Sequence, residues 1–215
     1  MIYTDTIIFD LDGTLLNTLE DLTDATNYAL KECGYPERTI SEIKNFVGNG
    51  IENLIKKAVP ENTNEIKIQE CLSIFKIYYL HNSLNKTKPY DGILTLLENL
   101  KKKGFKIGVV SNKFDKAVKN LCQEFFFGLV DVAKGESINT PKKPSPDGIL
   151  KTIKELNADI NKTVYVGDSE VDVLTAKNAG VYFVGVLWGY RDEKTLVDAG
   201  AKELVDSPER LEFIL

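Results

Sequence analysis

Residues 7–14 of this chain are Ile-Ile-Phe-Asp-Leu-Asp-Gly-Thr, and they decide how the rest of the sequence is interpreted. The apolar run indicates a buried strand, and two carboxylates stand where it ends. Residues two apart on an extended chain project to the same side, so Asp10 and Asp12 are expected to point in the same direction. Such close like charges repel unless a cation or a proton is shared between them. The pattern predicts a metal site or a carboxylate pair with divided roles, although an acidic turn after an edge strand also fits these residues alone.

Polar residues also follow two further apolar runs. Residues 106–110 and 163–166 each indicate a buried strand, and between them residues 142–146 open a helical stretch with prolines where helices begin. Parallel strands align their carboxyl ends at one edge of a sheet. We therefore expect one cluster at that edge, drawn from segments far apart in the sequence: Asp10, Asp12, Ser111, Asn112, Lys143, Asp168 and Asp172. Four carboxylates with one lysine are costly unless they serve a ligand, so the cluster predicts a site for a hard dication and a phosphate.

Four motifs in this order resemble those of the haloacid dehalogenase superfamily of phosphohydrolases. They are DLDGTL at 10–15, SN at 111–112, KKPSP at 142–146 and GDSEVD at 167–172, and together they frame nearly the whole chain. The resemblance implies an α/β fold with a Rossmann-like, doubly wound parallel sheet and an α-helical cap inserted after the first strand. A closer likeness to the phosphoglycolate phosphatase group rests on Val47-Gly48-Asn49-Gly50, Ser111-Asn112-Lys113 and Trp188-Gly189-Tyr190.

The resemblance implies catalytic roles for three residues. Asp10 is expected to attack phosphorus and form an aspartyl-phosphate, which divides one difficult displacement into two easier ones. Asp12 is expected to protonate the leaving oxygen and later to deprotonate the hydrolytic water. Lys143, immediately before Pro144, is expected to neutralise charge on the nucleophile and on the transferred group.

The resemblance also implies a magnesium ion, which prefers oxygen ligands and the phosphate of a substrate. The expected ligands are the side chains of Asp10 and Asp168 and the backbone carbonyl of Asp12. Ser111 and Asn112 are expected to bind the substrate phosphate. Supporting positions are expected at Gly13, Thr14, Ser169 and Asp172. Lys113 has two open roles: it either reaches a substrate carboxylate or begins the helix that follows.

A change of hydrophobic period divides the chain into two domains. Residues 1–15 and 88–215 are expected to form the core, and residues 16–87 are expected to form the helical cap. Within the cap, the spacing of apolar residues and the positions of Thr18, Gly34 and Gly50 predict helices at 18–34, 41–47, 51–59 and 64–83. The two crossings between the domains, near 16–17 and 84–89, are candidate hinges for closure of the cap.

Composition excludes several classes of partner. The chain has 215 residues, of which 43% are hydrophobic and 27% are charged, and its net charge of −5 argues against a nucleic-acid-binding surface. No apolar run is long enough to span a membrane, so no membrane partner is expected. Cys33, Cys71 and Cys122 show no paired spacing, which is typical of reduced thiols in a cytoplasmic protein.

The expected reaction is hydrolysis of a small, soluble phosphate ester. The leading substrate is 2-phosphoglycolate, because residues 48–50 offer backbone amides to a compact carboxylate, and pyrophosphate, a nucleotide or a sugar phosphate are alternatives. A β-phosphoglucomutase-like phosphotransferase shares the core chemistry and stays open. Asp12 and Asp168 argue against a haloacid dehalogenase, which uses neither a second aspartate nor a metal. A receiver-like phosphoacceptor domain is the weakest alternative, because it needs no cap and no Asp12.

Overall fold

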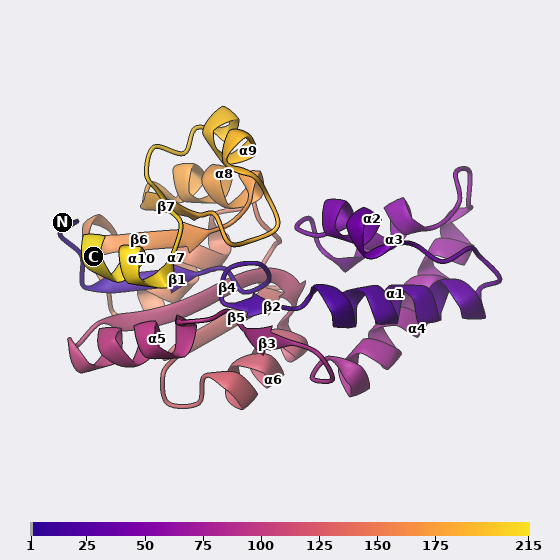
Figure 1. The fold of residues 1–215 in the computed structure, drawn as a ribbon, viewed down its shortest axis with the longest axis horizontal. Coiled ribbons are helices and arrows are strands. Elements are labelled where there is room, and N and C mark those ends of the chain that lie inside the picture. The colour runs from indigo at the N-terminus through magenta and orange to yellow at the C-terminus, as the bar shows by residue number, and fades with distance from the viewer. Residues whose placement is uncertain (1) are drawn as a thin grey trace.

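A six-stranded parallel sheet is the centre of the larger of two lobes in the computed structural model, which describes residues 2–215 (Figure 1). Its strands lie in the order β5-β4-β1-β6-β7-β8, so β1 is central and the connections run outward on both sides of it. The strand bounds are β1 Thr6–Phe9, β4 Lys106–Phe114, β5 Val132–Glu136, β6 Thr163–Gly167, β7 Tyr182–Val186 and β8 Leu204–Val205. The predicted Rossmann-like fold class is confirmed.

Alternate residues of the central strand point to opposite faces of the sheet. Both faces are apolar, and helices cover each of them. Ile7 and Phe9 belong to one buried apolar cluster, and Ile8 belongs to another. The first cluster includes residues of α5 (Ile93–Lys102), α6 (Asp115–Phe125) and α10 (Pro208–Ile214); the second includes residues of α7 (Asp147–Glu155) and α8 (Glu170–Ala179). Each fully buried Ile or Phe contributes about 1.5–3 kcal/mol, so this double burial fixes β1 in the centre.

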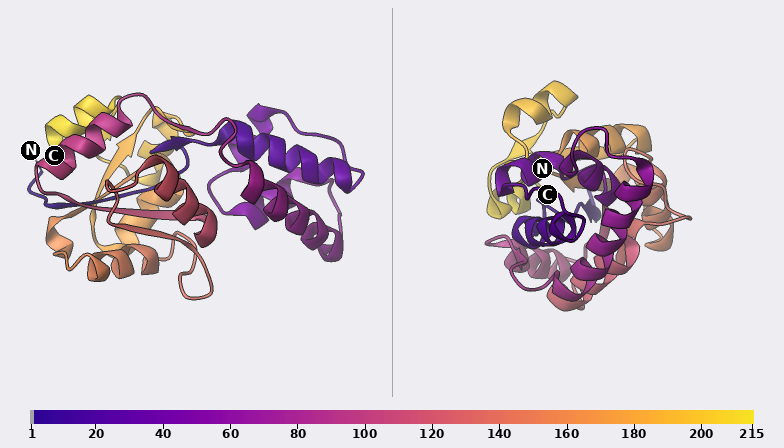
Figure 2. Two further views of the ribbon diagram at one scale, coloured as in Figure 1. Left: turned by 90° about the horizontal axis from the view of Figure 1, so that it is seen from below. Right: turned by 90° about the vertical axis from the view of Figure 1, so that its right-hand side faces the viewer.

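The smaller lobe consists of four helices with an apolar cluster largely of their own (Figures 1 and 2). They are α1 (Leu19–Glu32), α2 (Ile40–Phe46), α3 (Ile51–Ala58) and α4 (Glu65–Asn82). The buried residues of α1 follow the helical period, and α2 begins with a capping box in which Thr39 and Glu42 bond each other's backbone N–H groups. The four predicted cap helices are therefore present, within one to two residues of their predicted ends at most positions.

A short antiparallel ribbon joins the two lobes. Strand β2 (Leu16–Asn17) pairs with β3 (Lys88–Pro89), so both crossings run side by side. The helix predicted from Thr18 begins one residue later, at Leu19, because Leu16 and Asn17 form β2 and Thr18 precedes the helix. Thr18 precedes α1 as expected, but its hydroxyl donates to Asp12 and does not cap the helix.

Strand β4 is longer than predicted. The expectation that it ends before Ser111 and Asn112 is wrong, because the strand continues to Phe114, with an irregular register after Val110. The polar groups of both residues find partners at the site described below, so the strand tolerates them. Lys113 does not begin a helix, since α6 starts at Asp115.

The remaining elements complete the sheet lobe. They are a 3-10 turn at Ile160–Lys162 and α9 (Glu193–Ala199), which precedes the edge strand β8.

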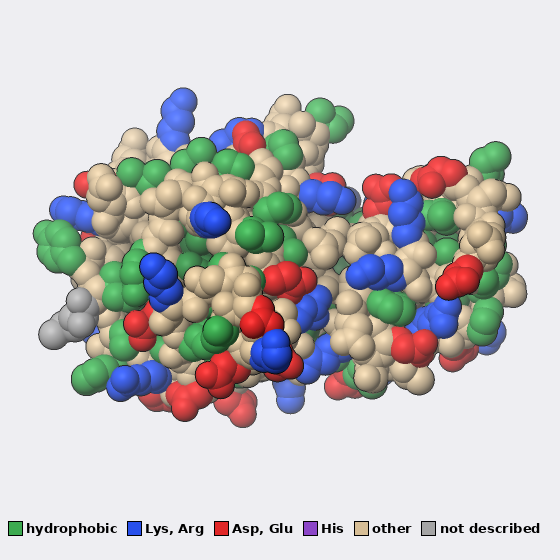
Figure 3. All heavy atoms as spheres, turned by 90° about the horizontal axis from the view of Figure 1, so that it is seen from above, with side chains coloured by type: hydrophobic (Ala, Val, Ile, Leu, Met, Phe, Trp, Pro, Cys, Tyr) green, Lys and Arg blue, Asp and Glu red, His purple; other side chains and the backbone are tan. Residues whose placement is uncertain are grey.

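Figure 3 shows acidic and basic side chains interspersed on one face and the surface hollowed between the lobes. Among the described residues, no helix combines the length and the apolar character that a membrane crossing requires.

Asp21 holds the second crossing against the first helix of the smaller lobe. Its buried carboxylate accepts hydrogen bonds from the backbone N–H of Lys86 at 3.0 Å and of Thr87 at 2.8 Å. Asp21→Ala leaves these donors without an acceptor, so we expect it to lower the free energy of unfolding by about 1–3 kcal/mol in urea titrations. The matched control is Asp24→Ala, which removes only an exposed ion pair with Lys86 and is expected to change stability by less than about 0.5 kcal/mol. Equal effects of the two substitutions would contradict the assigned role of Asp21.

Candidate active site

The carboxyl ends of β1, β4 and β6 meet the smaller lobe at a pocket to which both lobes contribute. The sheet lobe supplies most of the polar lining, and the smaller lobe supplies glycines and apolar side chains. This edge is the topological switch point of the sheet, where connections diverge and open α/β folds bind ligands. The sheet-lobe lining includes Asp10, Asp12, Ser111, Asn112, Lys143 and Asp168, so these six predicted site residues are brought together.

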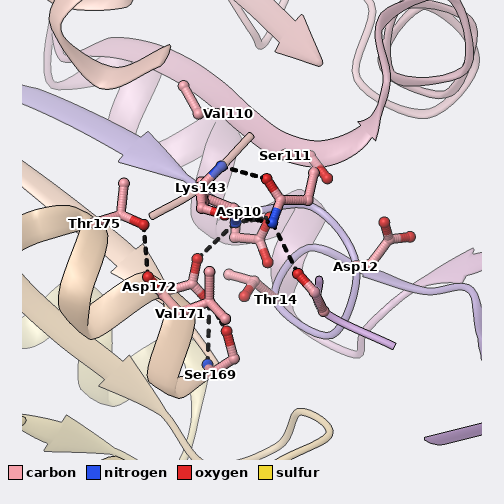
Figure 4. Close-up of polar contacts among 12 residues, drawn as sticks. Asp10, Asp12, Thr14, Val110, Ser111, Lys143, Ser169, Val171, Asp172 and Thr175 are labelled. Atoms are coloured by element: carbon pink, nitrogen blue, oxygen red, sulfur yellow. Dashed lines mark hydrogen bonds and ion pairs between the residues drawn. The ribbon is translucent and has the colours of Figure 1, made fainter. Parts of the chain in front are cut away.

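Lys143 lies between two carboxylates at the centre of this edge (Figure 4). Its Nζ is 2.7 Å from Asp10 Oδ1 and 2.6 Å from Asp172 Oδ1, and all three side chains are almost entirely buried. Burial alone would lower the pKa of the Lys143 ammonium, but the two carboxylates raise it above its ordinary value, so the lysine stays charged. Burial and the charge of Asp172 raise the pKa of Asp10, an effect that Lys143 opposes.

Asp172 is committed to hydrogen bonds at both of its oxygens. Oδ1 accepts from Lys143 and, at 2.8 Å, from the hydroxyl of Tyr165, while Oδ2 accepts from the backbone N–H and the hydroxyl of Ser169. Ser169 precedes α8, so these bonds also fix the start of that helix. The side chain of Asp172 is thus occupied in holding Lys143 and Ser169 in place.

Asp168 is held by the segment that follows β7. The backbone N–H of Tyr190 donates to Asp168 Oδ2 at 2.6 Å, and the Thr14 hydroxyl lies 3.4 Å from Oδ1. Gly13 has a positive φ of 86°, and a Cβ at this position would lie 2.7 Å from the Asp168 carboxyl carbon, so only glycine fits there. Burial, then the charge of Asp172, raises the pKa of Asp168 to about 7.

Asp12 lies apart from this cluster (Figure 4), and it pairs with a lysine of its own, Lys113. Its Oδ1 is 2.9 Å from Lys113 Nζ and accepts a hydrogen bond from the Thr18 hydroxyl. The buried Lys113 ammonium also lies 4.7 Å from the ring centroid of Tyr79 on α4. Burial opposes the charge of Lys113, but Asp12 and Tyr79 together raise its pKa, so it remains a cation. The ammonium of Lys113 is therefore engaged by Asp12.

Ser111 and Asn112 differ in what they can offer a ligand. The Asn112 carboxamide donates to the carbonyls of Lys143 and Gly48 and accepts from the Lys143 N–H at 2.6 Å, so it positions the loop that carries the lysine. The Ser111 hydroxyl oxygen accepts from the N–H of Lys113, which leaves its own hydrogen to donate into the pocket. Ser111 is thus the better placed of the two side chains to bond a phosphate oxygen.

The donor set fits a divalent cation. Oxygen atoms of Asp10, Asp168 and Asp172 lie within 4.8 Å of one another. Four buried or half-buried carboxylates, including Asp12, face two lysines, so two of the carboxylates lack a lysine partner when they are ionised. Asp10 Oδ1 also has no hydrogen-bond partner of good geometry. Because Asp172 is already saturated, Asp10 and Asp168 are the side chains that can hold the ion.

Several residues of this network were not predicted from the sequence. Tyr165 alternates with apolar neighbours in β6 and carries no mark of its bond to Asp172. The sequence indicates Thr18 only as the start of a helix, yet its hydroxyl bonds the Asp12 carboxylate and the Tyr190 hydroxyl. Arg191 follows the Trp188-Gly189-Tyr190 motif and was overlooked. Their adjacency to recognised motifs is the only signal that the sequence offers.

Taken together, the doubly wound sheet, the inserted helices and the buried Asp-Lys cluster define an α/β protein with a carboxylate-rich site at the switch point of its sheet. Residues 7–186 match the family described as haloacid dehalogenase-like hydrolase. Because this match covers most of the chain, the protein belongs to that family, and the predicted superfamily is confirmed.

Relatives that are named phosphoglycolate phosphatase narrow the class of enzyme to which this chain belongs. The chain is 37% identical over 185 residues to a phosphoglycolate phosphatase of Aquifex aeolicus, and the aligned region covers 86% of this chain and 85% of the relative. It is 32% identical over 204 residues to a phosphoglycolate phosphatase of Vibrio cholerae, covering 90% and 88% of the two chains. A crystal structure from Lactobacillus delbrueckii, of a protein proposed to be a phosphoglycolate phosphatase, superposes with a TM-score of 0.93 at 38% identity, covering 100% and 98% of the chains. The predicted class, a phosphoric monoester hydrolase, is confirmed by these relatives.

The raised pKa of Asp168 predicts how metal and pH act on stability. In the unfolded chain an aspartate titrates near 3.8, and in the folded, metal-free protein Asp168 titrates at about 7. The folded state therefore binds more protons between these values, so the stability of the metal-free protein falls as pH rises through this range. A divalent cation replaces the proton, so we expect magnesium to raise Tm more at about pH 7.5 than at about pH 5.

The measurement is thermal unfolding with and without magnesium at both pH values. Asp168→Asn is the matched control, since it removes the titrating carboxyl and is expected to abolish most of the magnesium effect. An equal rise in Tm at both pH values in the unsubstituted protein would argue against a metal bound through Asp168.

Proposed function

We propose that this protein is a magnesium-dependent phosphomonoesterase that hydrolyses 2-phosphoglycolate through an aspartyl-phosphate. The observation that carries the proposal is the pairing of two aspartates with two different buried lysines: Asp10 with Lys143 and Asp12 with Lys113. Two carboxylates that are two residues apart thereby have different environments. This separation suits a nucleophile and an acid/base group better than it suits a passive anion.

In the proposed reaction Asp10 attacks the phosphorus atom of the ester. Lys143, 2.7 Å away, counters the negative charge that the carboxylate and the transferred group share. The Ser111 hydroxyl donates to a phosphate oxygen and orients the group. Asp12 enters the cycle protonated, gives that proton to the departing oxygen, and regains one from the water that releases phosphate. Lys113 and Thr18, both bonded to Oδ1, hold the Asp12 carboxyl group in place for both steps.

We propose that Asp10 and Asp168, with the backbone carbonyl of Asp12, hold magnesium, as the spare charge and the hard oxygen donors favour. When bound, the ion neutralises phosphate charge and orients the substrate. Thr14, Gly13 and Ser169 support these ligands: the first two adjoin Asp168, and Ser169 bonds Asp172.

The choice of 2-phosphoglycolate rests on the relatives and on the part of the pocket that the smaller lobe covers. Gly48, Gly50 and Ile51 line it, and Gly50 precedes α3 with no side chain to cap it, so the first N–H groups of the helix are available to an anion. The carboxylate carbon of 2-phosphoglycolate is only two bonds from the ester oxygen, so this substrate is compact enough to fit between the turn and the site. Val47 and Leu54 border the same pocket with apolar side chains, which disfavours bulky polar substrates.

We propose that residues 16–87 act as a cap over a core formed by residues 1–15 and 88–215. Paired β2 and β3 make the two crossings adjacent, as a hinge requires, and closure would exclude water from the site. The three cysteines are free thiols, which supports a cytoplasmic location. A receiver-like module is disfavoured by Asp12 with its dedicated lysine, whereas a phosphotransferase of the mutase type is distinguished by its products.

Asp10→Asn is expected to lower phosphate release at least about a thousand-fold, because an amide is a poor nucleophile toward phosphorus. It is also expected to abolish the phosphoenzyme, measured by mass spectrometry after acid quenching. Asp5→Asn, at the exposed start of the same segment, is the matched control and is expected to retain full activity. Substantial turnover by the Asp10→Asn protein would overturn the nucleophile assignment.

Substrate choice is tested with a panel of esters in the presence of magnesium or a chelator. We expect kcat/KM for 2-phosphoglycolate to exceed that for sugar phosphates, nucleotides and pyrophosphate by at least about tenfold, since only the compact substrate places a carboxylate at the turn. We also expect the chelator to abolish release. Equal rates across the panel would remove the proposed substrate, and conversion of sugar phosphates to their isomers without release of phosphate would favour a mutase.

A further inference from the structure

The segment 188–191, Trp-Gly-Tyr-Arg, lies between the two lobes, and the proposed chemistry uses none of its side chains. The indole N–H of Trp188 donates to the Thr14 carbonyl at 3.0 Å, beside the nucleophile loop. The Tyr190 hydroxyl accepts from the backbone N–H of Thr18 at 3.0 Å, at the start of the smaller lobe. With its bond to Asp168, this segment is therefore fixed to the core edge and to the crossing.

Arg191, at the end of this segment, reaches across to the smaller lobe. Its Nη2 donates to the Val47 carbonyl at 2.6 Å, its Nη1 donates to the Lys44 carbonyl at 3.0 Å, and its Nε donates to Glu170 at 3.2 Å. Both carbonyls belong to the end of α2, where helix carbonyls lack partners within the helix. Hydrogen bonds from a guanidinium are stronger than neutral ones, and this side chain is only 15% exposed.

The chain between these carbonyls and α3 covers the site. Val47, Gly48 and Gly50 line the pocket, and a Cβ at Gly48 would lie 3.4 Å from Arg191 Nη2, so the glycine permits the close approach. From the other side of the pocket, Asn112 donates to the Gly48 carbonyl at 3.0 Å. Residues 44–50 are thus a strap that two side chains bond to the sheet lobe: Arg191 bonds the carbonyls of Lys44 and Val47, and Asn112 bonds the carbonyl of Gly48.

We propose that Arg191 is a positioning residue that holds the strap down on the core and thereby limits the size of the substrate that the pocket accepts. The arginine contributes no proton and contacts no reacting atom; it acts through the position of Val47 and Gly48. Glu170 orients the guanidinium, but the two carbonyl bonds hold the strap. The proposal rests on the proposed function only in its choice of 2-phosphoglycolate as the compact probe.

The test compares Arg191→Ala and Arg191→Lys with Lys194→Ala in the full chain. Lysine keeps the charge but cannot bridge two carbonyls and a carboxylate, so both Arg191 variants are expected to free the strap. Lys194 is an exposed neighbour that pairs with Asp198 on its own helix, which makes it the matched control. Glu170→Gln distinguishes the ion pair from the carbonyl bonds, since it weakens the pair of Arg191 with Glu170 but leaves both carbonyl bonds. Its hydrogen exchange and kcat/KM are expected to stay close to those of the unsubstituted protein.

Two measurements are made on each variant. Hydrogen exchange of backbone amides in residues 44–54 is expected to accelerate on the order of tenfold in both Arg191 variants, with no change in β6 peptides. The kcat/KM for 2-phosphoglycolate is expected to fall on the order of tenfold, mainly through KM, while that for the bulkier p-nitrophenyl phosphate stays constant or rises.

Unchanged exchange in residues 44–54, or an equal fall in kcat/KM for both esters, would overturn the role of Arg191. If Arg191→Ala does not fold, Arg191→Lys provides the same comparison with the charge retained. If the unsubstituted protein does not hydrolyse 2-phosphoglycolate, the proposed substrate fails, and hydrogen exchange still decides whether Arg191 holds the strap.

Discussion

The ion pair of Lys143 with Asp10 and Asp172 is the interaction on which the site depends. A single buried ammonium pairs with two buried carboxylates, one directly after β1 and one in α8, while Lys143 itself precedes α7. Removing one partner of such a group leaves an uncompensated charge and costs about 3–5 kcal/mol. The three segments are therefore held in one arrangement by their charges as well as by the apolar contacts of the sheet. The same arrangement presents Asp10 at the switch point of the fold.

Much of this arrangement could be predicted from the sequence, because carboxylates at the ends of apolar runs must meet at one edge of a parallel sheet. That argument placed Asp10, Asp168 and Lys143 together, and the helical period placed α1 to α4. It failed for β4, where Ser111 and Asn112 resemble the end of a strand. Their polar groups are satisfied by Lys113 and by the backbone of Lys143, so the strand continues through them. A pattern in one segment does not record partners that another segment supplies.

The same reason explains why the sequence leaves the role of Lys113 open and does not indicate a role for Arg191. Lys113 is bonded to Asp12, which lies 101 positions earlier in the chain and outside any local pattern. Arg191 is bonded to backbone carbonyls, which every residue has, at separations of 147 and 144 positions. Tyr165 and Thr18 are similar cases, since each polar group is directed at a residue of another element. Residues that position others are thus harder to predict than residues that carry the chemistry.

The glycines of the site follow from how closely its charges approach the backbone. Gly13 and Gly189 both adjoin Asp168, and a Cβ at Gly189 would lie 2.5 Å from its Oδ2. A side chain at either position would push away the carboxylate that the Tyr190 N–H holds. The glycine after the second aspartate is therefore required by a residue 155 positions away as well as by the local turn. This is why a motif that resembles an ordinary acidic turn in isolation is informative once the second carboxylate segment is present.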